Sequence, residues 1–102
     1  MSHALHTRDD WKQAREELQA LVAEWDPIDL LTTGAPLDEY DALVWPLMEK
    51  LDRGADADEI SVWLAAELPR RFGAATAADE VERFCRRTAK WFHARWPMPE
   101  RG

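Results

Sequence analysis

The chain has few of the residues on which most catalytic and metal sites depend. Its 102 residues include one cysteine, three histidines, two serines and four isolated glycines. One cysteine cannot form an internal disulfide, and no cysteine or histidine stands at the spacing of a zinc site. A glycine-rich phosphate loop and a nucleophile elbow are also missing from the sequence. We therefore predict that the protein is not an enzyme and that it uses no metal or other cofactor.

Long apolar runs are missing too. None approaches the ~18–20 residues that a helix needs to cross a bilayer. Residues 1–8 lack the apolar segment of a secretory signal, so no signal peptide is expected. Cys85 falls on an apolar helical stripe, which is the position of a buried thiol and suits a reducing compartment. We predict a cytoplasmic protein with no membrane partner.

Charge is abundant and unevenly distributed. The net charge is −7, composed of −1 over residues 1–23, −10 over residues 24–67 and +4 over residues 68–102. An acidic middle segment repels nucleic acid and anionic lipid and attracts basic partners. Simple solvation by surface carboxylates explains the same asymmetry. The sequence therefore predicts no nucleic-acid partner and leaves a basic protein partner as a hypothesis.

Every apolar series in the chain has the spacing of a helix. We predict an all-α fold with four helices, over residues 8–25, 37–53, 57–71 and 77–95. Short connections between helices of this length imply a compact four-helix bundle or an orthogonal four-helix array. The chain is expected to form one domain, residues 1–102, with flexible ends at residues 1–7 and 97–102.

The helix boundaries carry recognisable signals. The predicted N-caps are Thr7, Asp56 and Thr76, each followed three residues later by an acidic residue. Pro46 and Pro69 fall inside the second and third helices, where proline removes one backbone hydrogen bond. We expect Pro46 to kink or split its helix and Pro69 to bend or end its own.

Two acidic–aromatic clusters flank the first loop, at residues 24–29 (EWDPID) and 38–41 (DEYD). Three interpretations of their carboxylates compete. They cap helix ends locally, they form an acidic docking patch for a basic protein, or they bind magnesium or calcium. The spacing does not match an EF-hand loop, because the required glycine and terminal glutamate are missing.

Six tryptophans in a chain of this length are unusual. Trp11, Trp25 and Trp63 lie on inward stripes and are expected in the core. Trp45 lies roughly 140° around its helix from Tyr40, away from the apolar stripe. It is either a binding hot spot or a side chain that packs on the kink or the loop. Tyr40 is expected in the core, with its hydroxyl reaching a loop group.

Basic residues gather on one face of the last helix. The members of this face are Arg83, Arg86, Arg87 and Lys90. A solvated outer face explains them, and so does pairing with the acidic middle of the same chain. Head-to-tail association with a second copy is a further interpretation.

The order of these motifs resembles a family of short bacterial all-helical domains of unknown function. The shared pattern is Trp-Asp-Pro-Ile/Leu, a loop, Asp-Glu-Tyr-Asp, an apolar helix, a glycine and an acid-capped helix, over residues 18–72. This chain has Asp29 where the family usually has glycine. The resemblance implies a helical fold and carries over no catalytic residues.

These observations lead to one principal hypothesis and one alternative. The principal hypothesis is an acidic protein-binding module, most concretely an immunity or antitoxin protein that docks on a basic partner such as a toxin. The predicted contact residues are Asp29, Asp38, Glu39, Asp41 and Trp45. The alternative is a small structural or regulatory homo-oligomer, for example a homodimer, in which basic and acidic segments of different copies meet.

Overall fold

The structure is a computed structural model that describes residues 4–26, 34, 40–73 and 76–97. This part of the chain holds four α-helices and no strand. Their bounds are Arg8–Trp25 (α1), Asp41–Asp52 (α2), Ala57–Phe72 (α3) and Ala78–Arg95 (α4). The predicted all-α class is confirmed.

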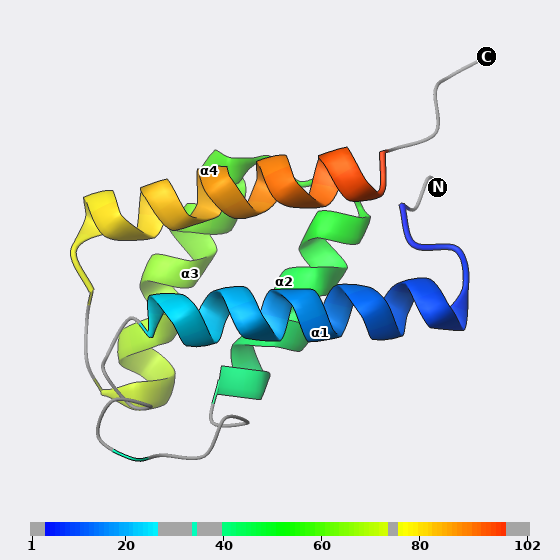
Figure 1. Cartoon of the computed structure of the whole chain (residues 1–102). Helices are drawn as coiled ribbons and strands as arrows, with labels where there is room; N and C mark the ends of the chain where they lie inside the picture. The colour runs from blue at the N-terminus through cyan, green and yellow to red at the C-terminus, as the bar shows by residue number, and fades with distance from the viewer. Residues whose placement is uncertain (1–3, 27–33, 35–39, 74–75, 98–102) are drawn as a thin grey trace.

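The four helices form two crossed pairs. In Figure 1, α1 and α4 run alongside each other in opposite directions, and α2 and α3 cross behind them. The most extensive helix contacts join α3 to α4 and α1 to α2. Of the two predicted arrangements, the orthogonal array describes these crossings better than a bundle with aligned axes.

Two of the predicted N-caps are confirmed. The Thr7 hydroxyl accepts the backbone N–H of Asp10 at 3.0 Å, and the Asp10 carboxylate accepts the N–H of Thr7 at 3.2 Å. This reciprocal pair satisfies two backbone groups at the start of α1. At the start of α3, the Asp56 carboxylate accepts the N–H of Glu59 at 2.8 Å.

The third predicted cap is wrong by one residue. The N-cap of α4 is Ala77, and its side chain forms no capping bond. The Ala77 carbonyl accepts the first backbone bonds of the helix, from Glu80 and Val81, at 3.1 Å each. α4 therefore begins at Ala78, one residue after the start that the Thr76 signal predicts.

The two internal prolines do not interrupt their helices. α2 continues through Pro46, and α3 continues through Pro69 to Phe72. The predictions that Pro46 could split its helix and that Pro69 could end α3 are therefore wrong. Leu47 follows Pro46 and Leu68 precedes Pro69, and both leucines are buried. Burial of such side chains offsets the one backbone bond that each proline removes.

Boundaries of α2 and α3 also differ from the predicted ones, and α2 ends at Asp52, one residue before the predicted end. The described part of α2 begins at Asp41 with Tyr40 as its N-cap, and residues 37–39 of the predicted helix lie outside the described residues. α3 ends at Phe72, one residue later than predicted, and its C-cap is Gly73, whose φ of 68° is the left-handed conformation that glycine adopts at low cost.

The core includes part of the N-terminal segment. Ala4 and Leu5 are buried, although residues 1–7 were expected to be flexible. The N–H of Leu5 donates to the Asp52 carboxylate at 2.7 Å, and the N–H of Ala4 donates to the Asp52 carbonyl at 3.1 Å. Asp52 is itself buried at the end of α2. This residue therefore fixes the segment that precedes α1 against the core.

The remaining core follows the predicted stripes. Cys85 is fully buried, and burial raises the pKa of its thiol to about 12. Trp11, Trp25 and Trp63 pack against the core while staying partly exposed, and Trp96 is buried. None of the helices in the described part of the chain is long and apolar enough to cross a membrane.

Candidate functional site

A hydrogen bond between described residues joins the two acidic–aromatic clusters. The Tyr40 hydroxyl donates to the Asp26 carboxylate at 2.6 Å. The Tyr40 side chain is buried, and its ring meets the Phe72 ring edge-on at 5.7 Å. Asp26 is the C-cap of α1, with a left-handed φ of 44° and its N–H bonded to the Val22 carbonyl. The prediction for Tyr40 is confirmed, and Asp26 has an architectural role.

The predicted contact residues divide into two groups. Asp29, Asp38 and Glu39 lie outside the described residues. Asp41 is half-buried at the start of α2, where its carboxylate accepts the side-chain amide of Gln19 at 3.1 Å. Trp45 is exposed, with 47% of its surface accessible. The predicted outward position of Trp45 is therefore confirmed.

Asp41 and Trp45 belong to a stripe along the outer face of α2. Residues four apart on a helix are neighbours on its surface. Asp41 lies one turn before Trp45, and Glu49, which is exposed, lies one turn after it. We call Asp41, Trp45 and Glu49 the α2 stripe. Sequence reasoning missed Glu49, although its spacing from Trp45 was the signal that could have revealed it.

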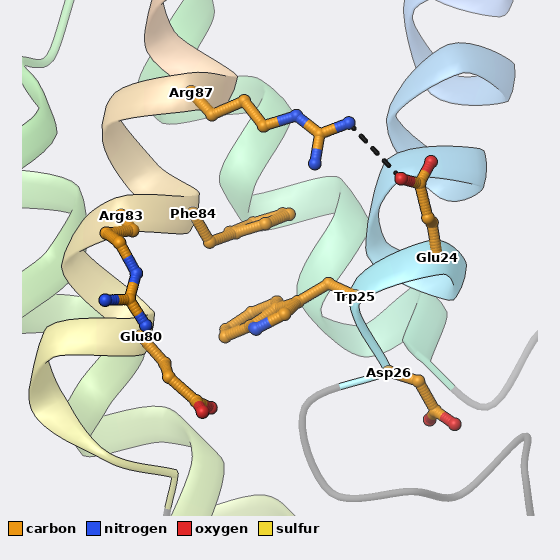
Figure 2. A pocket seen from close by; sticks show the side chains of 7 residues that line it. All are labelled: Glu24, Trp25, Asp26, Glu80, Arg83, Phe84 and Arg87. Carbon is orange, nitrogen blue, oxygen red and sulfur yellow. Dashed lines mark hydrogen bonds and ion pairs between the residues drawn. The ribbon is translucent and has the colours of Figure 1, made fainter.

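A cleft opens between the end of α1 and the first half of α4, with a volume of about 550 Å³. Its lining residues are Glu24, Trp25, Asp26, Glu80, Arg83, Phe84 and Arg87. The Trp25 indole stacks on the Phe84 ring, with centroids 4.1 Å apart and planes inclined by 12° (Figure 2). The cleft is therefore lined by a stacked aromatic pair with charged side chains around it.

Both arginines of this α1–α4 cleft contact carboxylates. Arg87 lies 3.4 Å from Glu24 across the cleft, and Arg83 lies 3.5 Å from Asp79 on its own helix. Within the described residues, the Glu80 side chain has no hydrogen bond or ion pair. The seven lining residues include three carboxylates and two guanidinium groups, so the cleft is negative overall.

The basic face of α4 is largely matched by nearby acids. Arg83 and Arg86 pair with acids one turn earlier on α4, Asp79 and Glu82. Arg87 pairs with Glu24, which belongs to the acidic middle segment. These pairs are exposed, so each contributes little to stability. The predicted pairing with the acidic middle is therefore present at Arg87.

The structure brings no group of three or more histidine, cysteine, aspartate or glutamate side chains together as a metal site within its described residues. Comparison of the chain with protein-family models, with curated proteins and with solved structures gives no match. The resemblance of residues 18–72 to short bacterial helical domains stays a prediction.

Proposed function

We propose that the protein is an acidic protein-binding module that docks on a basic partner protein through the α2 stripe. The observation that carries this proposal is the exposure of Trp45, at 47%, between two carboxylates one helical turn away on either side. Aromatic residues that become buried at the centre of an interface supply much of its binding energy. The neighbouring carboxylates favour a cationic partner and reject an anionic one.

The charge of the whole segment supports the same choice of partner. Residues 24–67 carry a charge of −10, which accelerates association with a basic protein. Added salt screens this attraction and weakens it. An immunity or antitoxin protein that covers a basic toxin fits this chemistry. Asp29, Asp38 and Glu39 remain in the proposal on the strength of the sequence. The single, buried thiol of Cys85 is compatible with a cytoplasmic site of action.

The test is affinity capture with matched surface variants. The purified protein is immobilised, and proteins from the source cells that it retains are identified by mass spectrometry. The binding variants are Trp45→Ala and Asp41→Lys, together with the double variant Asp38→Lys/Asp41→Lys. The controls are Val62→Ala, which alters another exposed large apolar side chain, and Glu16→Lys, which reverses an exposed charge on α1.

The proposal predicts a basic protein that the wild type and both controls retain and that the binding variants lose. All variants should keep the helical circular dichroism of the wild type, because none of the changed residues that the structure describes belongs to the buried core. Retention of the same protein by Trp45→Ala and by the double variant would contradict the proposal. So would a specific partner that is acidic.

The alternative, a homo-oligomer joined by basic and acidic segments, has less support. Arg83, Arg86 and Arg87 already contact carboxylates of their own chain, which reduces the charge available to a second copy. Light scattering at several salt concentrations decides between the two. A dimer that dissociates as salt rises favours the alternative, and a monomer at every ionic strength excludes it.

A further inference from the structure

The surroundings of the Trp25 indole in the α1–α4 cleft are not explained by docking through the α2 stripe. One face of the Trp25 indole is covered by Phe84, at a centroid distance of 4.1 Å. Trp25 is nevertheless only half-buried. Figure 2 shows Glu80 on the side of the indole that faces away from Phe84, whereas the Asp26 carboxylate points away from the indole. The other face of the indole therefore lies toward the Glu80 carboxylate in the cleft.

This combination of groups is selective for a planar cation. An indole face attracts cations through its quadrupole, and arginine stacks on such faces more readily than lysine. A guanidinium group can also donate paired N–H bonds to a carboxylate while it lies flat on a ring. Glu80, whose side chain forms no hydrogen bond or ion pair within the described residues, is the acceptor best placed for such bonds.

We propose that the α1–α4 cleft binds the guanidinium group of an arginine side chain. The guanidinium lies against the face of Trp25 that Phe84 does not cover and donates to the Glu80 carboxylate. The assignment of this arginine to a basic partner protein rests on the function proposed above. The cation selectivity of the cleft rests on its own residues.

The two arginines of the cleft do not turn it into an anion site. Arg87 faces Glu24 at 3.4 Å, and Arg83 faces Asp79 at 3.5 Å, so a carboxylate lies beside each guanidinium. An incoming anion would meet the negative charge of these carboxylates and of Glu80. A cation can approach Glu80, whose side chain forms no hydrogen bond or ion pair within the described residues.

A titration with a small probe tests the cleft without the partner. N-acetyl-arginine amide is added to the ¹⁵N-labelled protein, and the Trp25 indole and Glu80 amide signals are followed by NMR. Trp25→Phe identifies the indole signal. N-acetyl-citrulline amide, which has nearly the same shape and no charge, is the matched ligand, and inorganic phosphate tests for anion binding.

The proposal predicts a saturable shift of both signals with the arginine probe and none with the citrulline probe. Glu80→Gln should lower the affinity about tenfold or more, since it removes a hydrogen bond to a charged group. Glu16→Gln, which neutralises an exposed acid elsewhere on α1, should leave the affinity unchanged.

Three results overturn the proposal. They are equal shifts with arginine and citrulline probes, an affinity that Glu80→Gln does not alter, and shifts of the cleft signals by phosphate alone. Trp45→Ala separates the two proposals, because it should leave arginine binding intact. If the captured basic protein is still retained by Trp45→Ala and by Asp38→Lys/Asp41→Lys, docking through the α2 stripe is refuted while the titration still decides the cleft.

Discussion

Replacing Tyr40 by phenylalanine removes the hydroxyl that joins the two acidic–aromatic clusters and leaves the ring in place. The hydroxyl donates to the Asp26 carboxylate at 2.6 Å from an almost completely buried side chain. The ring keeps its edge-on contact with Phe72, so the variant removes the bond from the hydroxyl to Asp26 and changes little packing. It therefore measures how strongly the end of α1 is tied to the start of α2.

The expected loss follows from the surroundings of the bond. A hydrogen bond to a charged group stabilises a fold by about 1.5–3 kcal/mol. Asp26 is half-buried, so water can solvate its carboxylate in the variant, and the lower end of about 1.5 kcal/mol applies. For a domain of this size, such a loss in the free energy of unfolding lowers Tm by roughly 6–12 °C.

Urea unfolding followed by circular dichroism gives the change directly. The matched background is Asp26→Gly, which removes the acceptor and suits the left-handed φ of 44° at this position. Tyr40→Phe should cost little in that background, because the acceptor is already gone. Equal losses in the two backgrounds, or no loss in the wild type, would refute the assignment of stability to this bond.

Three further predictions follow from other buried groups. Asp52→Ala removes the acceptor of the Leu5 N–H, so we expect at least about 1.5 kcal/mol lower unfolding free energy and faster exchange of that amide, with a smaller effect for Asp52→Asn. The Arg71 guanidinium, followed by that of Arg70, lowers the pKa of Glu67 from its usual 4.5. This carboxylate therefore stabilises the fold above that pH, and the contribution is lost as pH falls through the lowered pKa; Glu67→Gln should flatten this part of an acid-unfolding curve. Because burial raises the Cys85 pKa to about 12, a thiol reagent at about pH 8 should modify Cys85 only as fast as the protein unfolds.

Local sequence signals predicted the helices well because each signal acts within a few residues. The Thr7 and Asp56 caps satisfy backbone groups that lie two or three positions away. Helical periodicity placed Trp45 outside, since the apolar stripe of α2 points the other way. The predictions that proline splits or ends a helix are wrong, because local helix signals do not include the stability that buried side chains near the proline provide.

Long-range contacts decided the features that the sequence did not predict. The Trp25–Phe84 stack and the Glu24–Arg87 contact join residues about 60 positions apart. The bond between Leu5 and Asp52 spans 47 positions. Periodicity gives the face of a helix on which a side chain lies, and it contains no information on which helix lies opposite. The α1–α4 cleft therefore became visible only in the fold.

The end of α1 holds the two proposed binding surfaces in one fixed arrangement. Successive helix residues point about 100° apart, so Glu24 and Trp25 face α4 while Asp26 receives the Tyr40 hydroxyl. The Gln19–Asp41 bond adds a second link to the start of α2. Surfaces held in this way lose little conformational freedom when a partner binds, and less of the contact energy is spent on ordering them. The architectural carboxylate of Asp26 therefore contributes to binding indirectly, by fixing how the α2 stripe and the α1–α4 cleft face a partner.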